Sequence, residues 1–355
     1  MTVRAEARGF EEKEIAEAVN LCDARGRLLP AAVGWSRRPL HTCNLSGHPL
    51  RKKRWNYWCI TSDSYLFSVT LASVDYMGLA FAYFLERETG RFVEKTVTVP
   101  FGRGCDLPDT VRGDAVFSHR DMSLRFVEKG DQTAIRVESP AFGGAALSAD
   151  FLVERPADHE TLNVVIPWSA DRFHFTSKQN CLPVSGAVSL GGDVFEFAPG
   201  NAFACLDYGR GVWRYATSWN WGSLSGRHGG RIIGLNLGGS WTDGTGVTEN
   251  AIFIDGHISK VAADVHFLYD RSDFMKPWRI RTEPSSPGRV AFGDGQIDLR
   301  FEPFFERVAR TNLLLLRSEV HQMFGRYSGT VVPDGGVPVR FEGLLGWVEQ
   351  HEARW

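Results

Sequence analysis

The part of this chain best suited to chemistry is a short segment in which a carboxyl group is followed by several aromatic residues. Asp207 is followed by Tyr208, and Trp213, Trp219 and Trp221 lie just downstream. A carboxyl in an apolar pocket keeps its proton to higher pH, and aromatic faces stabilise positive charge. These residue types suit proton transfer to a substrate. An aspartate that caps a turn beside core tryptophans would give the same pattern.

Two further carboxyls are candidates. Glu249-Asn250 follows a glycine-rich stretch at residues 238–246, and unmatched polar groups on such loops often mark sites. Asp75 precedes Tyr76 between long apolar stretches, where a carboxyl would be desolvated. We therefore take Asp207, Glu249 and Asp75 as candidate catalytic residues, with turn stabilisation as the alternative for each.

Substrate-binding candidates surround these acids. The basic run at residues 51–54 could hold the head group of an amphiphile, or it could be a solvated face. His228, in a glycine-rich turn, could shuttle protons near neutral pH or simply face solvent. The residues expected to bind substrate are Tyr57, Trp58, Tyr76, Tyr208, Trp219, Trp221, Asn250, Arg54 and His228.

Several other chemistries lack their motifs. The chain has no G-x-G-x-x-G after a strand, no P-loop and no G-x-S-x-G elbow. Its ten histidines are dispersed, so we expect neither a metal site nor a cofactor. Glycoside hydrolysis by Asp207 and Glu249 stays open, because their separation cannot be read from sequence.

The chain also repeats itself. The run from Trp55 to Trp58 returns as Trp219-Asn220-Trp221, and the tripeptide at 124–126 returns at 299–301. The clearest copy matches Gln179, Ser185-Gly186, Asp207 and Trp213 with Gln322, Ser328-Gly329, Glu349 and Trp355. A period longer than the 20–50 residues of solenoids indicates a duplicated domain. We expect an extension at 1–20, a first domain at 21–210 and a second at 211–355, with an extra hairpin or two in the first roughly within 127–165.

Most of the chain alternates at the period of a strand, with turns rich in Gly, Pro, Asp and Asn. Residues 304–323 are expected to be mainly strand, and residues 10–21 a short N-terminal helix. The predicted fold is all-β: two tandem lipocalin-like antiparallel barrels or half-open sandwiches from an internal duplication.

Composition sets the remaining expectations. Forty basic against 42 acidic residues give a net charge of −2, which offers no electrostatic footprint for nucleic acid. No run of 18 apolar residues could span a bilayer, and the first residues lack a secretory apolar region. Six cysteines without paired spacing are expected to be free thiols in a cytoplasmic protein.

Several short segments carry a resemblance to a known family. They are Leu21-Cys22-Asp23, Gly34-Trp35-Ser36-Arg37, Lys53 to Trp58, Asp75-Tyr76, Trp219-Asn220-Trp221, Thr248-Glu249-Asn250 and Glu349 to Trp355. Together they resemble the bacterial domain of unknown function 2804 over nearly the whole chain. Two lipocalin-like halves with an acid closing the first also resemble, more distantly, the AttH, carotenoid 1,2-hydratase and tocopherol cyclase group. Enzymes of that group protonate an isoprenoid double bond, and water or an internal hydroxyl captures the cation.

The resemblance implies a cofactor-independent hydratase, cyclase or isomerase that uses acid catalysis on a hydrophobic or amphipathic small molecule. A non-catalytic carrier of lipid or isoprenoid, or a carbohydrate-active enzyme with two carboxylates, would fit the same residues. Whether the chain is an enzyme, and its oligomeric state, stay open at this point. We expect Asp207 and Glu249 to border one aromatic-lined site between the halves, near Tyr57, Trp219 and Trp221.

Overall fold

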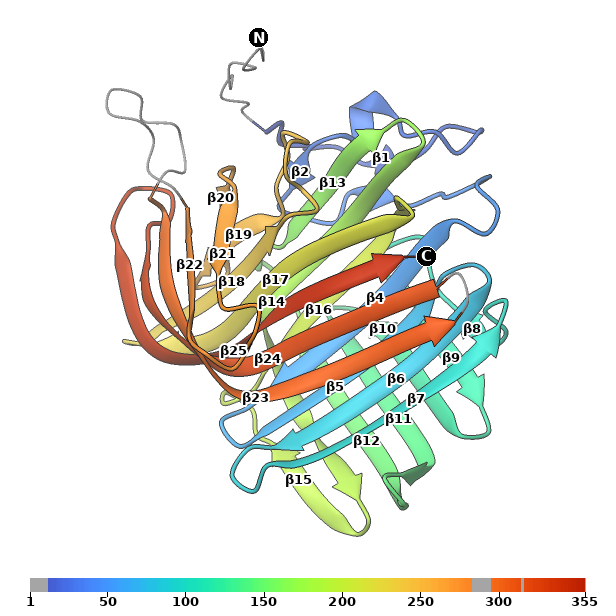
Figure 1. Ribbon diagram of the computed structural model, residues 1–355, viewed down its shortest axis with the longest axis vertical. Helices are drawn as coiled ribbons and strands as arrows, with labels where there is room; N and C mark the ends of the chain where they lie inside the picture. The colour runs from blue at the N-terminus through green and yellow to red at the C-terminus, as the bar shows by residue number, and fades with distance from the viewer. Residues whose placement is uncertain (1–11, 283–294, 314–315, 355) are drawn as a thin grey trace.

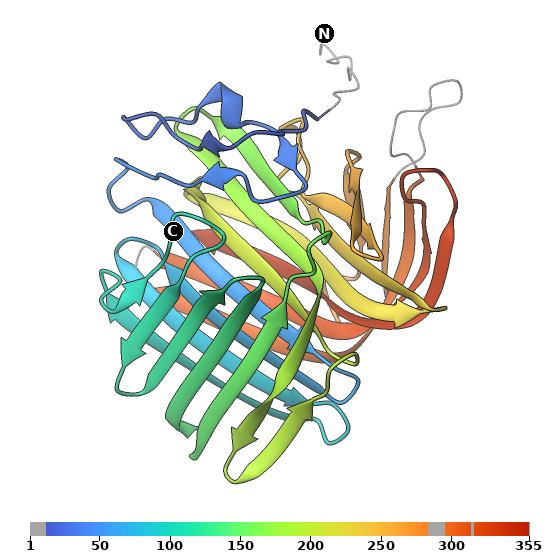
Figure 2. The ribbon, with the colours of Figure 1, turned by 180° about the vertical axis from the view of Figure 1, so that it is seen from behind.

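The computed structural model describes residues 12–282, 295–313 and 316–354. Most of this part of the chain is β-strand, and the strands form two long curled antiparallel sheets, each a half-barrel (Figures 1 and 2). The only helical element in these ranges is a 3-10 turn at Pro30–Ala32. The all-β, lipocalin-like prediction is confirmed.

The first sheet has fourteen strands, eleven of them along one path of neighbours. In spatial order the path is β7 (Arg91–Pro100), β6 (Met77–Glu86), β5 (Tyr65–Ser73), β4 (Lys52–Thr61), β16 (Phe203–Val212), β14 (Arg172–Leu190), β12 (Ala145–Glu154), β11 (Gln132–Phe142), β10 (Met122–Lys129), β9 (Ala115–His119) and β8 (Cys105–Asp106). The strands off this path are β13 (Leu162–Ser169), β15 (Asp193–Phe197) and β2 (Trp35–Ser36). A separate parallel pair joins β1 (Val19–Asn20) to β3 (His41–Thr42).

The second sheet has nine strands. Their spatial order is β20 (His257–Val261), β19 (Asn250–Ile254), β18 (Arg231–Gly239), β17 (Ala216–His228), β25 (Val339–Arg354), β24 (Leu316–Val331), β23 (Ile297–Leu313), β22 (Trp278–Thr282) and β21 (Val265–Leu268). This order repeats the path of the first sheet from β7 to β10. We propose residues 213–215, which link β16 to β17, as the boundary between the halves.

Strand register shows the duplication at the level of single residues. Tyr57 on β4 pairs with Asp207 on β16. Trp221 on β17 pairs in the same way with Glu349 on β25. Glu349 is therefore the counterpart of Asp207, and Trp219 that of Trp55, as the sequence repeats predicted.

Two of the sequence matches need correction. Leu299 lies on β23, whose place in the second sheet is that of β12, whereas Leu124 lies on β10. The tripeptides at 124–126 and 299–301 are therefore not equivalent. Gln322 pairs with Glu349, but the residue opposite Asp207 is Lys178 and not Gln179. Trp355, the expected counterpart of Trp213, lies outside the described residues.

The additional strands of the first half are also not where the repeat lengths placed them. β8 and β9, at 105–119, and β15 have no counterpart in the second sheet, so the extra hairpin expected within 127–165 is wrong. That expectation depended on the mismatched tripeptides. Within the window the structure instead has a break at 155–161, which divides β12 from β13, while the equivalent β23 runs on unbroken.

The N-terminal helix predicted for residues 10–21 is wrong for its described part. Glu14 bridges to Trp35, and β1 pairs with β3. Glu12 is anchored in the second half, where its Oε1 lies 2.8 Å from Lys260 Nζ. These tertiary contacts override helix propensity. The strand prediction for residues 304–323 is confirmed by β23 and β24.

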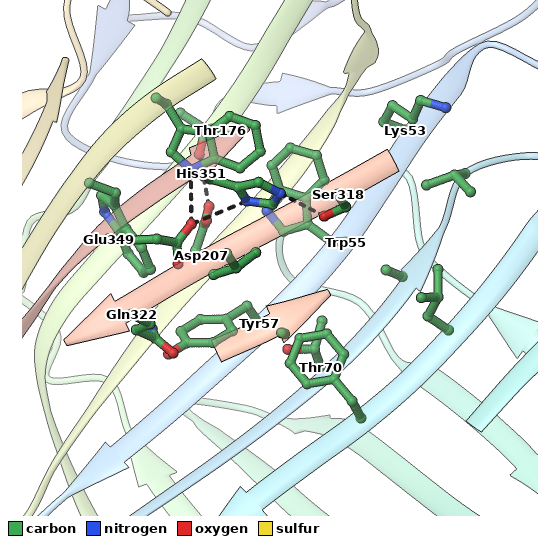
Figure 3. A pocket seen from close by; sticks show the side chains of 18 of the residues that line it. Lys53, Trp55, Tyr57, Thr70, Thr176, Asp207, Ser318, Gln322, Glu349 and His351 are labelled. Carbon is green, nitrogen blue, oxygen red and sulfur yellow. Dashed lines mark hydrogen bonds and ion pairs between the residues drawn. The ribbon is translucent and has the colours of Figure 1, made fainter. Parts of the chain in front are cut away.

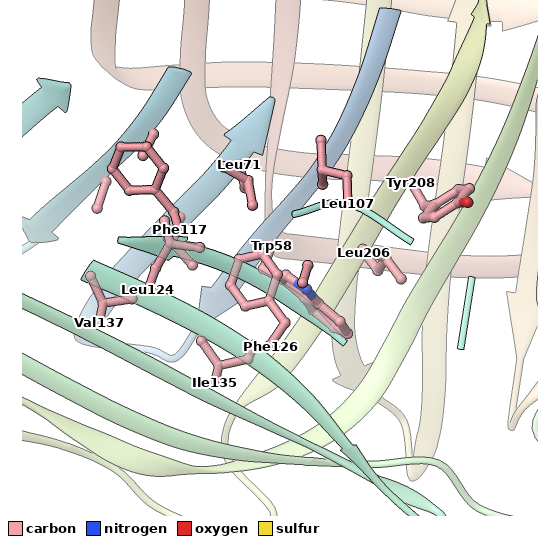
Figure 4. Close-up of a cluster of buried hydrophobic side chains, with 14 of the residues drawn as sticks. Trp58, Leu71, Leu107, Phe117, Leu124, Phe126, Ile135, Val137, Leu206 and Tyr208 are labelled. Carbon is pink, nitrogen blue, oxygen red and sulfur yellow. The ribbon is translucent and has the colours of Figure 1, made fainter. Parts of the chain in front are cut away.

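Each half-barrel is filled by its own apolar core. In the first, Trp58 packs edge-on against Phe126, with their ring centroids 6.4 Å apart (Figure 4). In the second, Trp278 and Phe301 are buried among aliphatic side chains. Because both interiors are packed, a ligand site has to form elsewhere. All six cysteines are free, and no helix of the described residues is long and apolar enough to cross a membrane.

The halves pack face to face, with β23–β25 lying against β4–β7 (Figure 1). Tyr83 on β6 donates a hydrogen bond to Gln322 on β24, at 2.9 Å. Arg307 on β23 lies 2.7 Å from Glu94 on β7. The first contact is buried and the second is partly exposed, and together they fix the interface in one register.

Candidate functional site

A cavity of about 270 Å³ lies between the two sheets. Its wall is rich in aromatic rings and comes mainly from β4–β7, β14 and β16 on one side and from β17 and β23–β25 on the other. Successive side chains of a strand point to opposite faces of the sheet. On β4, Trp55 and Tyr57 therefore face this cavity, while Trp58 faces the core of the first half. The aromatic rings of the wall are Trp55, Tyr57, Phe81, Trp213, Trp219, Trp221 and Trp241.

A lysine clasped by two carboxylates forms the polar centre of this cavity. Lys178 Nζ lies 3.0 Å from Asp207 Oδ2 and 3.1 Å from Glu249 Oε2. The ammonium also lies 4.5 Å from the centroid of the Trp221 ring, a cation–π contact. All three charged side chains are buried, so these interactions are weakly screened by solvent.

The charges of this cluster shift one another's proton affinity. Burial opposes the charged form of Lys178, but Asp207 and Glu249 outweigh it and raise the pKa of the amine. Burial raises the pKa of Glu249, and Asp207 adds to that shift, while Lys178 and the Trp241 N–H oppose it. Lys178 is therefore a fixed cation, and Glu249 is a carboxyl whose proton is held to higher pH than usual.

Each carboxylate is also held by a neutral donor. Thr176 donates its hydroxyl to Asp207 Oδ1 at 3.1 Å. The Trp241 indole N–H donates to Glu249 Oε1 at 2.7 Å. With one oxygen on Lys178 and the other on these donors, both carboxyls are fixed in orientation, as an acid or base needs to be.

The opposite wall carries a second polar group, drawn in Figure 3. The Trp219 indole N–H donates to Glu349 Oε1 at 2.9 Å. His351 Nδ1 lies 3.4 Å from the same oxygen, and His351 Nε2 lies 2.8 Å from Ser318 Oγ. The His351 ring packs on Trp219, with centroids 3.8 Å apart.

A buried histidine completes the wall of the first half. His174 stacks on Trp55, with centroids 4.5 Å apart. Its Nδ1 accepts the indole N–H of Trp213 at 2.9 Å, and an indole nitrogen is only a donor, so the ring proton sits on Nε2. Burial, helped by Lys178 and Arg210, lowers the pKa of His174 well below its usual range. His174 is therefore a neutral imidazole that turns an N–H toward the interior.

Six of the residues singled out from the sequence line this one cavity. They are Asp207, Glu249, Tyr57, Trp219, Trp221 and Arg54.

The other six lie elsewhere, for local geometric reasons. Trp58 and Tyr208 point into the first core, because each is one residue out of phase with the cavity face. Asp75, with φ of +72°, turns the β5–β6 hairpin and pairs with Lys52 at 3.1 Å. Tyr76 in the same turn lies under Lys53 Nζ at 4.9 Å.

Asn250 and His228 are likewise outside the cavity lining. The Asn250 side chain binds backbone, accepting from Gly238 N and donating to Ala263 O, so it braces the loop beside Glu249. His228 sits half-buried where β17 ends. Asn250 therefore has a structural role, and His228 is too far along the hairpin to face the cavity.

Sequence reasoning missed Lys178, His351, His174 and Ser318, and used Glu349 only as a repeat marker. The duplication held the signal for Glu349, since its counterpart Asp207 was already a candidate. Lys178 was one position from the matched Gln179, and the irregular register of β14 beyond Gln179 concealed the shift.

The cluster does not resemble a metal centre. Within the described ranges no three His, Cys, Asp or Glu side chains are arranged to hold a metal ion. The position between Asp207 and Glu249 that a cation would take is filled by the Lys178 ammonium.

Two packed half-barrels with an aromatic cavity between them define a double lipocalin-like protein. The chain belongs to the family described as Domain of unknown function (DUF2804), whose model matches residues 12–355. No curated protein sequence is significantly similar to it.

The solved structures of CghA and of an AttH share the fold at low identity. CghA, solved with Sch210972, is 12% identical, with a TM-score of 0.52 over 86% of this chain and 89% of its own. An AttH from Nitrosomonas europaea is 11% identical, with a TM-score of 0.50 over 84% and 92%. Kievitone hydratase from Nectria haematococca is 10% identical, with a TM-score of 0.43 over 98% of both chains.

Proposed function

We propose that this protein is a cofactor-independent hydratase, cyclase or isomerase that protonates a hydrophobic or amphipathic small molecule. The observation that carries the proposal is the buried cluster of Asp207, Lys178 and Glu249 in an aromatic cavity. That a protein of the same fold, CghA, was solved with Sch210972 supports ligand binding as the first step.

Glu249 is the proton donor in this proposal. Its pKa is raised by burial and by Asp207, which brings a carboxyl acid closer to the operating pH where proton transfer is efficient. Asp207 holds the lysine in place with its second oxygen on Thr176. The sequence favoured Asp207 as the acid, whereas the raised pKa of Glu249 favours Glu249.

The cluster also suits the cation that protonation creates. With both carboxyls ionised it carries one net negative charge, since Lys178 offsets only one of them. Transfer of the Glu249 proton to a carbon–carbon double bond leaves that negative charge facing the new cation. The Trp219 and Trp221 rings add cation–π stabilisation, worth about 0.5–1 kcal/mol each where water reaches them and about 2 kcal/mol where it does not.

The geometry disfavours glycoside hydrolysis. That reaction needs two carboxyls on opposite sides of the scissile bond, separated widely enough for a sugar or a water. Asp207 and Glu249 both face the same ammonium, so they lie side by side on one wall. A carrier would need the cavity and its aromatic wall but no acid of raised pKa.

The test begins with organic extraction of the purified protein and mass spectrometry of any bound compound. Unsaturated compounds of that class are then incubated with the protein in heavy water. An enzyme incorporates deuterium at carbon, and Glu249→Gln abolishes that incorporation. Asp75→Asn, a carboxyl outside the cavity, is the matched control and should leave it intact. Ligand binding without deuterium incorporation by the wild type would establish a carrier instead.

A further inference from the structure

The wall opposite Lys178 carries a serine, a histidine and a glutamate in series. Ser318 Oγ lies 2.8 Å from His351 Nε2, and His351 Nδ1 lies 3.4 Å from Glu349 Oε1 (Figure 3). All three side chains line the cavity. Glu349 and His351 are two residues apart on β25, so they share a face, and Ser318 comes from the neighbouring β24.

The surroundings fix the roles that these groups can take. The Trp219 N–H holds Glu349 Oε1, and the Trp219 ring covers the face of His351. His351 Nδ1 faces Glu349 Oε1 at 3.4 Å, so the tautomer that the triad uses carries its proton on Nδ1 and leaves Nε2 to accept the Ser318 hydroxyl. This is the nucleophile–base–acid order of acyl-transfer enzymes, and such contacts are commonly long before substrate binds.

We propose that Ser318, His351 and Glu349 form a catalytic triad for hydrolysis of esters whose acyl group is hydrophobic. This goes beyond the proton-transfer function proposed above, because it uses neither Lys178 nor Glu249. The aromatic wall selects an apolar acyl or aryl group, and Ser318 stands where its carbonyl carbon would be attacked.

The steps balance with water as the only co-reactant. Ser318 Oγ bonds to the ester carbonyl carbon while His351 Nε2 takes the hydroxyl proton. The carbon–oxygen bond to the leaving alcohol breaks, and His351 returns the proton to that oxygen. Water then attacks the acyl-serine, its proton passing through His351 to Ser318 Oγ, which releases the carboxylic acid. Glu349 stays ionised and stabilises the imidazolium.

The first half lacks this arrangement. The serine, histidine and glutamate are therefore not a feature that both copies of the duplicated fold share. By register, the counterpart of Ser318 is His174, and the counterpart of His351 is Gly209. At Gly209 a Cβ would meet the Trp55 ring at 2.1 Å, so no side chain fits there. At these three equivalent positions, the second copy has a serine, a histidine and a glutamate where the first has His174, Gly209 and Asp207.

The experiment uses the full-length protein and a fluorophosphonate probe, which phosphonylates activated serines. We expect a single adduct, mapped to Ser318 by peptide mass spectrometry, together with hydrolysis of medium-chain p-nitrophenyl esters. Ser318→Ala and His351→Gln should each lower labelling and hydrolysis by roughly a thousandfold. Ser328→Ala, on the same strand but away from the cavity, is the matched control and should be labelled like the wild type.

Three results would overturn the triad: no adduct on folded wild-type protein, an adduct on another residue, or labelling unaffected by His351→Gln. Ser318→Cys guards against misfolding of the alanine variant. Its thiol should react with iodoacetamide faster when His351 is present than in the double variant. Neither readout requires an unsaturated substrate. A negative result here would therefore not contradict the proton-transfer proposal, and failure of the proton-transfer test would not contradict the triad.

Discussion

Lys178 lies on β14 of the first half, and its ammonium lies 3.1 Å from Glu249, which immediately precedes β19 of the second half. The charge cluster is therefore completed only when the two copies pack together. Asp207, from the same half as Lys178, supplies the other contact at 3.0 Å. The first half alone would hold only the Lys178–Asp207 pair, so the three-membered cluster needs both copies.

Removal of the lysine is the most direct test of that cluster. Lys178→Met leaves two buried carboxyls without their cation, and breaking a buried pair this way costs about 3–5 kcal/mol. The free energy of unfolding at neutral pH, measured by urea titration, should fall by that amount. The loss should shrink as the pH falls toward 4.5, the ordinary pKa of glutamate, because Glu249 then takes up a proton. A loss that is independent of pH would contradict an electrostatic cause.

The two carboxyls should differ in their effect on turnover once a substrate is known. Glu249→Gln removes the proposed proton donor, so kcat should fall by about 10²–10⁴ while ligand affinity changes little. Asp207→Asn keeps the proton donor but loosens Lys178, and should lower kcat less. Steady-state kinetics and ligand-induced tryptophan quenching measure the two quantities. If both variants raised KM equally and left kcat unchanged, Glu249 would not be the acid.

Features of the fold that depend on patterns of many residues could be predicted from the sequence. Strand alternation and the Trp55/Trp219 repeat are patterns of many residues, and they predicted the all-β duplicated fold. The interface cavity was expected from Asp207 closing the first repeat and from Glu249 lying where the second copy departs from the first. Both side chains do line it.

What the sequence could not give are register and tertiary pairing. A register shift between Gln179 and Leu182 moves the functional position from Gln179 to Lys178. Ser318 and His351 meet only because β24 and β25 are neighbours, which short motifs cannot show. Residues 12–21 have helical composition, but pairing with distant strands decides their conformation.

The neutral state of His174 predicts sensitivity to acid. Its pKa is lowered well below 6.5, chiefly by burial. At mildly acidic pH the histidine therefore binds a proton in the unfolded chain but not in the folded chain. Stability from this group is complete above pH 6.5 and is lost as the pH falls below it, at up to about 1.4 kcal/mol per pH unit. Burial lowers the pKa of His41 and His159 in the same direction.

Unfolding free energies between pH 5 and pH 7 test this. His174→Gln keeps an acceptor for the Trp213 N–H but cannot titrate, so its stability should fall less steeply with acid than that of the wild type. His228→Gln, at the end of a hairpin, is the control and should keep the wild-type slope. An unchanged slope in His174→Gln would show that His174 is protonated in the folded state.

Gly238 offers a way to displace Glu249 without changing any charge. A Cβ at this position would lie 2.1 Å from Glu249 Oε1, which is closer than non-bonded atoms approach. Gly238→Ala should therefore push the carboxyl off the Trp241 N–H and away from Lys178, at a cost of about 1–3 kcal/mol in unfolding free energy. Turnover of the true substrate should fall nearly as far as in Glu249→Gln, although the acid is still present. Gly226→Ala, where a Cβ meets only the movable end of Leu344, is the matched control. Full activity in Gly238→Ala, with a crystal structure showing Glu249 displaced, would remove Glu249 from the reaction.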